Sequence, residues 1–393
     1  MAHMLALIVL GACIAALAYT VVALRCLWSF GRRIDAFERT RAQERGIAFS
    51  SSMPTLPSVT ILKPVASDEP DLYGNLCSFC AQDYPQFQAV FGVADAGDSA
   101  IATVRRVIEA FPQADPSLVI GADTTAPNFK VATLLAMASA CKHDVLVVAD
   151  SDTKVDPTYL RAVVAPLADI SVGAVTCVYR GRSTGGLASD LGAMMIDEQF
   201  IPSVLVAALG TVRFCLGATM AVRRRVLDAI GGFAALAPYL ADDQKLGEMV
   251  SRQGSRVAIA PFVVEHDVAE PDMRALWAHE VRWARTSRLA RPLGYAGYFI
   301  TYPLPLALVF AALSHDVVLG PIVLALAVAL RLATHYAART ALRVRTPDKP
   351  WLIPLRDILG LAVWIASLGG KHVRWRDTLL TVDGAGRIVS GTG

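Results

Sequence analysis

The chain has 393 residues, of which 54% are apolar and 18% are charged, and its formal net charge is +3. Soluble domains average roughly 45–50% apolar and about 25% charged residues, so this composition favours a protein that meets lipid. The small net charge and the lack of a long basic run in the central region argue against a nucleic-acid-binding protein.

The first membrane segment is predicted close to the N-terminus. Residues Leu5 to Leu24 carry no charge, and a helix of that length spans a hydrocarbon core of about 30 Å. A signal peptide would have a shorter apolar run followed by a small-residue cleavage site. This run ends instead in an arginine-rich stretch that begins at Arg25. Such a basic flank is typical of a retained anchor and places the following chain in the cytoplasm.

A second apolar region follows the central part of the chain. Gly294 to Leu313 lacks charge but contains two prolines, so a helix there is expected to be kinked or broken. Val317 to Leu330 is uniformly apolar and is followed by several arginines, which again favours a cytoplasmic flank. Trp351 to Gly370 contains Arg356 and Asp357, charges that cost a few kcal/mol at bilayer depth. Whether this third segment spans, re-enters or lies in the interface stays open.

Between the apolar regions, short β-branched runs alternate with segments of helical period. Nearly all-apolar strands of this kind suit a parallel sheet that is buried on both faces. Their alternation with helices predicts a doubly wound α/β domain. The predicted strands are Ser58–Leu62, Ala89–Val93, Leu118–Gly121, Val145–Ala149 and Ala174–Val178, and helices are predicted at Ala100–Ala110 and Val131–Ala140.

Acidic residues follow the predicted strands, where such sheets bind their ligands. Asp95 follows one strand, and Asp150 and Asp152 follow another. Two carboxylates at this spacing can share a divalent cation such as Mg or Mn, which can neutralise a diphosphate leaving group. Asp242 and Asp243 begin a later helical segment. They are either acids favoured by the helix dipole or include the base that deprotonates an attacking hydroxyl.

A basic and aromatic stretch, His279 to Arg285, precedes the second apolar region. Taken alone, it can be a juxtamembrane collar. Beside the acidic sites, Arg282 would meet a diphosphate and Trp283 would form part of the sugar or acceptor wall. His266 follows an apolar strand and is either a third metal ligand or a structural histidine.

In this order, the motifs resemble those of the ceramide glucosyltransferases, inverting enzymes with the GT-A fold. Bacterial relatives of that family include the hopanoid-biosynthesis-associated glycosyltransferases. The likeness runs from about residue 59 to residue 288 and includes the flanking membrane segments. The matching pieces are Thr60–Pro64, Asn75-Leu76, Asp83–Pro85, Asp95, Asn128–Lys130, Asp150, Gly217–Thr219, Asp242-Asp243 and Arg282-Trp283.

The resemblance implies roles for individual residues. Asp243 matches the catalytic base, with Asp242 beside it in the same acidic pair. His279 departs from the Gln or Arg of the family pattern, and Asp152 completes an Asp-x-Asp that some relatives lack. The metal therefore rests on the chemistry of Asp150 and Asp152 as much as on the resemblance. Contacts with the donor are implied for Asp95, Lys130, Asp150, Arg282 and Trp283.

These observations predict an integral protein of a bacterial inner membrane with a cytoplasmic catalytic domain. It would transfer a hexose from a UDP-sugar to the hydroxyl of a ceramide- or hopanoid-type lipid, with inversion and without nucleic acid or an obligate protein partner. A processive polysaccharide synthase, which needs more membrane helices, and an inactive lipid-binding protein are the alternatives. The expected organisation is an anchor (1–30), a basic linker (31–57), the GT-A domain (58–290), a membrane region (294–370) and a polar tail (371–393).

Overall fold

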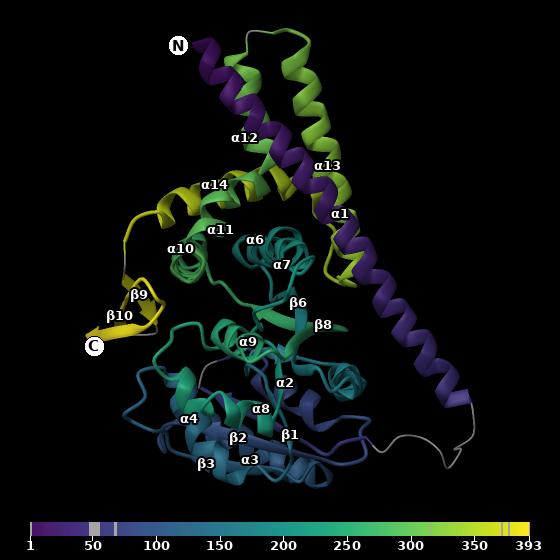
Figure 1. Ribbon diagram of the computed structural model, residues 1–393, viewed down its shortest axis with the longest axis vertical. Helices are drawn as coiled ribbons and strands as arrows, with labels where there is room; N and C mark the ends of the chain where they lie inside the picture. Colours follow the sequence, from purple (N-terminus) through teal and green to yellow (C-terminus); the bar gives the residue numbers. More distant parts are fainter. Residues whose placement is uncertain are drawn as a thin grey trace.

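The computed structural model describes residues 2–46, 56–66, 69–314, 316–370, 372–375 and 378–392. Residues 47–55 of the predicted linker lie outside the described residues. Long apolar helices form one end of the molecule, an α/β domain forms the other, and shorter helices lie between them (Figure 1).

The α/β domain is built on a mixed sheet of eight strands in the order β3-β2-β1-β4-β7-β6-β8-β5. Strands β1 to β4 are parallel, as the sequence predicts, whereas β7 runs antiparallel between β4 and β6. The strands are β1 (Val59–Val65), β2 (Phe87–Val93), β3 (Ser117–Ile120), β4 (Val145–Val148), β5 (Thr153–Lys154), β6 (Val172–Ser183), β7 (Met220–Arg223) and β8 (Arg256–Val268).

Helices cover both faces of this sheet, so alternate residues of one strand enter different cores. Ile61 of β1 belongs to the larger core, and its neighbour Leu62 belongs to the smaller core on the opposite face. This alternation follows from the two-residue period of a strand and explains why β1 is largely apolar. The helices of the domain are α2 (Leu72–Cys80), α3 (Ala100–Ala110), α4 (Phe129–Met137), α5 (Tyr159–Val164), α8 (Arg224–Ala229) and α9 (Asp242–Arg252).

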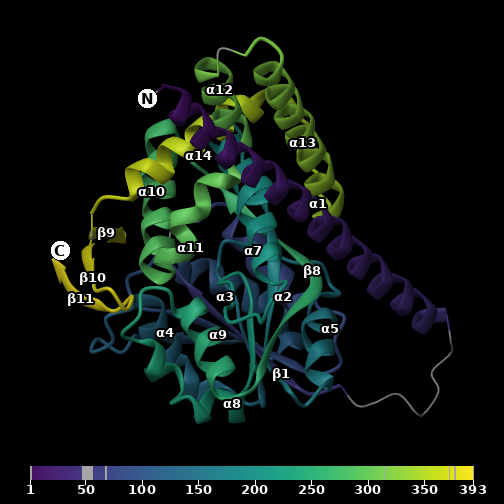
Figure 2. The same cartoon turned by 45° about the horizontal axis from the view of Figure 1, so that its top comes forward.

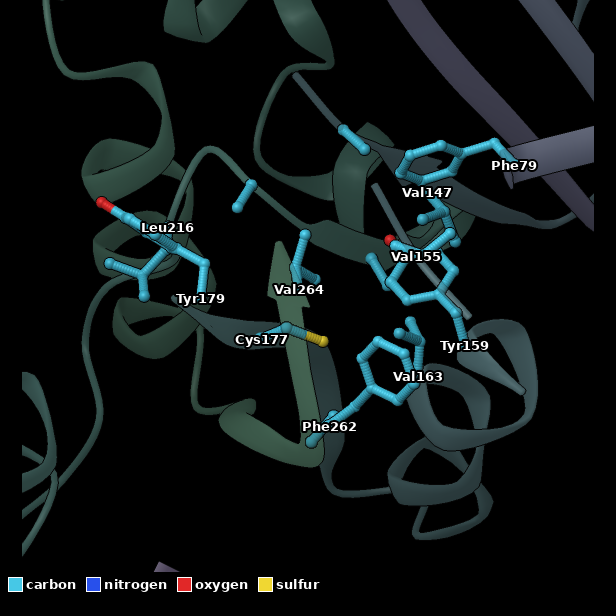
Figure 3. Packing of buried hydrophobic residues seen from close by; sticks show 14 of the residues in the cluster. Phe79, Val147, Val155, Tyr159, Val163, Cys177, Tyr179, Leu216, Phe262 and Val264 are labelled. Atoms are coloured by element: carbon cyan, nitrogen blue, oxygen red, sulfur yellow. The ribbon is translucent and has the colours of Figure 1, made fainter. Parts of the chain in front are cut away.

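Aromatic packing joins α5 to the sheet in the larger core. The Tyr159 ring stands edge-on to Phe79, at 5.4 Å between centroids, and to Phe262, at 5.5 Å (Figure 3). Its hydroxyl hydrogen-bonds to Thr219 at 2.9 Å, so the buried polar atom has a partner. This contact ties the core to the loop that later forms one wall of the candidate site.

A middle layer of shorter helices separates the domain from the apolar bundle (Figure 1). One turn in it, η4 (Ile196–Phe200), is π-helical, a feature that often marks a functional site. The helices of this layer are α6 (Leu187–Met195), α7 (Ile201–Ala207), α10 (Met273–Ala290), α11 (Pro292–Ala296) and α14 (Ile353–Ser367). Single 3-10 turns occur at η1 (Pro112–Ala114), η2 (Ala138–Ala140), η3 (Ala165–Ala168), η5 (Phe233–Leu236), η6 (Gly297–Thr301) and η7 (Pro350–Leu352).

The apolar bundle consists of α1 (Ala2–Gly46), α12 (Pro303–Leu313) and α13 (Leu319–Ala341). Among the described residues, three helices are long and apolar enough to cross a membrane, in His3–Gln43, Leu319–Ala341 and Pro350–Ser367. A fourth span arises if Pro292–Thr301 and Pro303–Leu313 act together across their 66° bend. The two prolines in this part of the sequence, Pro303 and Pro305, predicted the break.

Helix α1 continues far beyond the apolar run and packs on the α/β domain (Figure 2). Leu27 and Phe30 are buried in the larger core. Farther along, the Arg33 guanidinium donates a hydrogen bond to the Ile259 carbonyl of β8 at 2.7 Å. The helix therefore joins the bundle and the domain as one packed unit.

The third apolar segment, Trp351 to Gly370, contains two charged residues, and both are paired. Arg356 is fully buried on α14, and its guanidinium forms hydrogen bonds of 2.5 and 2.7 Å with the Glu280 carboxylate of α10. Asp357 accepts hydrogen bonds of 2.8 to 3.0 Å from Arg331 of α13, which also contacts Glu198 at 3.2 Å. Pairing offsets the cost of burying these charges. Figure 1 shows α14 running across the bundle, beneath α12 and α13.

Residues predicted as a polar tail form a small antiparallel sheet of β9 (His372–Trp375), β10 (Thr378–Val382) and β11 (Ile388–Thr392). This sheet packs on the loop that precedes α9. The Leu240 amide donates to the Gly386 carbonyl at 3.1 Å, and the Ile388 amide donates to the Pro238 carbonyl at 2.8 Å. The sheet thereby fixes the backbone just before the Asp242-Asp243 pair.

Candidate active site

The candidate active site forms around one largely covered lysine, whose side chain is 13% exposed, at the carboxyl end of β4. Lys130 lies in the first turn of α4, and its Nζ is 2.6 Å from Asp150 Oδ1. The same Nζ is 3.6 Å from Asp242 Oδ2. Three segments that are far apart in the sequence therefore meet at one ammonium group. The strand-end rule predicted the location of Asp150.

Helix capping positions both the lysine and the acidic pair. Asn128 is the N-cap of α4, and its Oδ1 accepts a hydrogen bond from the Val131 amide at 3.1 Å. Its Nδ2 donates to the Tyr239 carbonyl at 2.8 Å. One side chain thus begins the helix that carries Lys130 and holds the loop that leads to Asp242.

Asp242 and Asp243 are the first two residues of α9. The Asp243 carboxylate accepts a hydrogen bond from the Gln244 amide at 2.6 Å. Burial, and then the charge of Asp242, raise the pKa of Asp243 to about 7, although Lys130 acts in the opposite direction. A carboxyl group with a pKa near neutrality has the proton affinity required of a general base.

The Gly217–Thr219 stretch approaches the lysine–aspartate pair so closely that a side chain would collide with it. A Cβ at Gly217 would lie 2.5 Å from Asp150 Oδ2 and 3.5 Å from Lys130 Nζ. Two residues earlier, the Cys215 amide donates to the Asp243 carbonyl at 3.2 Å. The loop before β7 therefore forms a backbone wall between Asp150 and Asp243.

Asp152 lies on the other side of Asp150, beside β8. Its Oδ1 is buried, lacks a hydrogen-bond partner among the described residues, and is 3.4 Å from His266 Nδ1. Although burial alone lowers the pKa of His266, the Asp152 carboxylate raises it above its ordinary value. The His266 ring contacts Tyr179 at 5.3 Å and Trp283 at 6.1 Å between centroids. An aromatic wall therefore adjoins the second aspartate.

The pKa of Tyr179, on β6, is influenced by three of the acidic residues. Burial raises the pKa of its phenol well above the ordinary value, and the carboxylates of Asp243, Asp150 and Asp152 raise it further. Because Coulombic effects of this kind fall off with distance, all three carboxylates are close enough to act on this phenol. Sequence reasoning missed Tyr179, which looks like an ordinary residue of a strand.

Lys63 is a second residue that the sequence did not single out as part of the site. Its side chain is buried, its Nζ donates to the Asp150 carbonyl and to Thr153 Oγ1, the latter at 3.2 Å, and it lies 3.7 Å from the Phe79 ring centroid. Burial lowers the pKa of Lys63 to about 7. The available signal was a lysine in the middle of a largely apolar strand. Its contacts fix the backbone from which Asp150 projects.

The remaining predicted residues come from the end of β2 and from α10. Asp95 follows β2 at the same edge of the sheet, is exposed, and accepts a hydrogen bond from the Gly97 amide at 2.8 Å. Arg282 and Trp283 lie on α10. The Trp283 ring meets His279 edge-on at 4.7 Å between centroids. Burial lowers the pKa of Arg282.

Comparisons with known proteins identify the family of the chain. The sequence profile described as Glycosyl transferase family 21 matches residues 8–388. Ceramide glucosyltransferase 1 of Caenorhabditis elegans is 22% identical over 233 residues, which are 59% of this chain and 50% of that protein. Ceramide glucosyltransferase of Komagataella phaffii is 28% identical over 145 residues, 36% of this chain and 27% of that protein. The chain thus spans half or less of these relatives.

Among solved structures, the chain is similar to "Mannosyltransferase PcManGT from Pyrobaculum calidifontis in complex with GDP-Man and Mn2+". The TM-score is 0.50 at 19% identity, with 91% of this chain and 97% of that chain covered. This likeness supports the predicted GT-A fold and its flanking helices. Because the family profile covers nearly the whole sequence, the chain belongs to glycosyl transferase family 21, as its motifs predicted.

Proposed function

We propose that this glycosyltransferase transfers a hexose from a UDP-sugar to the hydroxyl of a ceramide- or hopanoid-type membrane lipid, with inversion at the sugar. The observation that carries the proposal is the cluster of Asp150, Asp242 and Asp243 around Lys130, next to the helices that join the domain to the apolar bundle. The similarity to ceramide glucosyltransferases supports the choice of acceptor class.

In the proposed reaction, Asp243 accepts the proton of the lipid hydroxyl. The hydroxyl oxygen then forms a bond to the anomeric carbon, the bond from that carbon to the UDP oxygen breaks, and UDP leaves from the opposite face. A single displacement of this kind inverts the anomeric configuration. The raised pKa of Asp243 supports its assignment as the base, because a carboxylate of ordinary pKa is a weak proton acceptor.

The donor would bind along the carboxyl edge of the sheet. Asp95, at the end of β2, would contact the nucleotide, while Lys130 and Arg282 would face the diphosphate. Cationic side chains at such a site stabilise the charge that develops on the leaving group. Trp283 would pack against the sugar or the acceptor, and its contacts with the aromatic wall support this role.

We propose that Asp150 and Asp152 hold a divalent cation, Mg or Mn, when the donor is bound. The residues fit a hard cation, because the buried Asp152 Oδ1 has no hydrogen-bond partner among the described residues. Within that same part of the chain, no three His, Cys, Asp or Glu side chains form a ready metal site. Oxygen atoms of the donor would have to complete the coordination. When bound, the cation neutralises the diphosphate leaving group.

The proposed setting is a bacterial inner membrane, with the α/β domain on the cytoplasmic side. The arginine-rich flank of α1 supports this orientation, because Arg33 contacts β8 of the domain and basic flanks lie on the cytoplasmic side. A lipid acceptor would then approach from the bundle while a water-soluble donor arrives from the opposite side.

Membranes that contain the protein test the proposal when they are incubated with labelled UDP-hexoses and either ceramide or a hopanoid alcohol. We expect one discrete glycolipid, and its anomeric configuration, read by NMR, should be opposite to that of the donor. Asp243→Asn should reduce transfer by at least a thousandfold. Asp144→Asn, at an exposed site, is the matched control and should leave transfer unchanged. Labelled polymer would indicate a polysaccharide synthase, and no product with any donor would indicate a lipid-binding protein.

The cation is tested separately by EDTA treatment followed by addition of Mn²⁺ or Mg²⁺. Transfer should be lost with EDTA and restored by the metal. In addition, the wild-type protein should bind Mn²⁺ measurably in the presence of UDP, whereas Asp152→Asn should bind it more weakly. Full activity in EDTA would refute the metal assignment and leave the base assignment intact.

A further inference from the structure

A cleft with a volume of about 510 Å³ opens beside α9. It lies between the exposed face of α9, the end of α10 and the loop that follows α7. Its lining is polar and strongly basic. The residues that line it are Thr211, Arg213, Gln244, Glu248, Ser251, Arg252, Ala290 and Arg291.

The charges in this cleft do not cancel. Its one acid, Glu248, already pairs with Lys245 at 3.0 Å and with Arg252 at 2.5 Å. Neither Arg213 nor Arg291 forms an ion pair with any residue that the structure describes. Burial lowers the pKa of Arg291, the Glu248 carboxylate raises it, and the Arg213 guanidinium lowers it further. Three arginines and one glutamate leave the lining with a net positive charge, which favours an anionic ligand.

The cleft is next to the proposed base. Gln244, which lines it, donates its amide hydrogen to Asp243 at 2.6 Å. The Arg291 guanidinium lies over the Phe214 ring at 5.2 Å, and the following residue, Cys215, donates its amide hydrogen to the Asp243 carbonyl. A ligand in the cleft would therefore contact the two segments that hold Asp243.

Exposed leucines flank the arginines. Leu209, two residues before Thr211, is 70% exposed, and Leu293, two residues after Arg291, is 91% exposed. Arg291 also ends α10, directly before the bent apolar pair that leads into the bundle. Leucines that face outward beside arginines are typical of a surface at the membrane interface, where apolar side chains enter the acyl region and cations meet headgroups.

We propose that this cleft binds the phosphate-bearing headgroup of an anionic phospholipid, such as phosphatidylglycerol, which is distinct from the acceptor. Arg213 and Arg291 bind the phosphate, and Leu209 and Leu293 contact the acyl chains. Guanidinium groups suit phosphate because they can donate two parallel hydrogen bonds. The bound lipid fixes the loop at Phe214 and the start of α9 at the membrane surface.

The test measures binding, not transfer, on the full-length chain in a neutral detergent. Dioctanoyl-phosphatidylglycerol, dioctanoyl-phosphatidylcholine and inorganic phosphate are titrated separately by calorimetry. We expect saturable binding of phosphatidylglycerol only. Arg213→Gln/Arg291→Gln should weaken it by roughly thirtyfold, the effect of two interfacial cations. Arg105→Gln/Arg225→Gln, at exposed sites on α3 and α8, is the matched control and should bind as the wild type does.

Ser251→Asp provides a second variant if the double substitution impairs folding. It places a carboxylate in the cleft and should weaken phosphatidylglycerol binding while circular dichroism stays unchanged. Equal binding of phosphatidylcholine, equal binding of inorganic phosphate, or unchanged affinity in folded Arg213→Gln/Arg291→Gln would overturn the proposal. Because no sugar transfer is measured, those outcomes would leave the proposed glycosyltransferase reaction standing.

Discussion

The proposed base makes a quantitative prediction for the pH dependence of transfer. Burial and Asp242 raise the pKa of Asp243 to about 7, and only the ionised carboxylate can accept a proton. Transfer should therefore rise with pH, from roughly one tenth of its plateau at pH 6 to about nine tenths at pH 8. Initial rates of kcat/KM with labelled donor, measured across that range in one ionic-strength-matched buffer series, would report the midpoint.

Substitution of the neighbouring acid should move this midpoint in a known direction. The charge of Asp242 raises the pKa of Asp243, so Asp242→Asn should shift the rising limb of the residual activity to lower pH. Asp144→Asn, whose side chain is 98% exposed, should leave the midpoint where it is. A wild-type midpoint near pH 4, or an unchanged midpoint in Asp242→Asn, would refute the assignment of Asp243 as a base of raised pKa.

Two further predictions concern the packing around the site. Gly217→Ala places a Cβ about 2.5 Å from Asp150 Oδ2, so the carboxylate must move. We expect kcat/KM to fall roughly a hundredfold with little change in Tm, and a rate within twofold of wild type would contradict the close approach. Arg356→Met leaves Glu280 buried without its partner, which should reduce the free energy of unfolding by about 3–5 kcal/mol. Thermal unfolding in detergent should show partial recovery when Glu280→Gln is added, and no recovery would argue against the ion pair.

The parallel half of the sheet could be predicted from the sequence because its strands are buried on both faces. An apolar run such as Val145–Ala149 indicates a buried strand without further information. Because ligands bind at the carboxyl ends of such strands, the sequence then pointed to Asp150. Strand β7 could not be predicted in the same way. It has only four residues, and its antiparallel position between β4 and β6 depends on the loop that Gly217 allows to pass close to Asp150.

Pairings between distant segments also escaped sequence reasoning. In the sequence, Arg356 and Asp357 argue against a membrane helix. Their partners, Glu280 and Arg331, lie in other segments of the chain, so the pairing is visible only in the structure. Lys63 is visible in an apolar strand, but only the fold shows that its amine contacts the Asp150 carbonyl. A sequence displays the residue type and the local period, whereas such contacts depend on which elements become neighbours.

The small sheet of β9, β10 and β11 also sets the order in which the molecule can mature. It hydrogen-bonds to the loop at Pro238 and Leu240, although its strands follow α12, α13 and α14 in the chain. During synthesis, these strands leave the ribosome only after the bundle helices have been made. The loop that precedes the acidic pair therefore gains its final support late, so the nascent chain completes the geometry of the candidate site only after its apolar helices have been made.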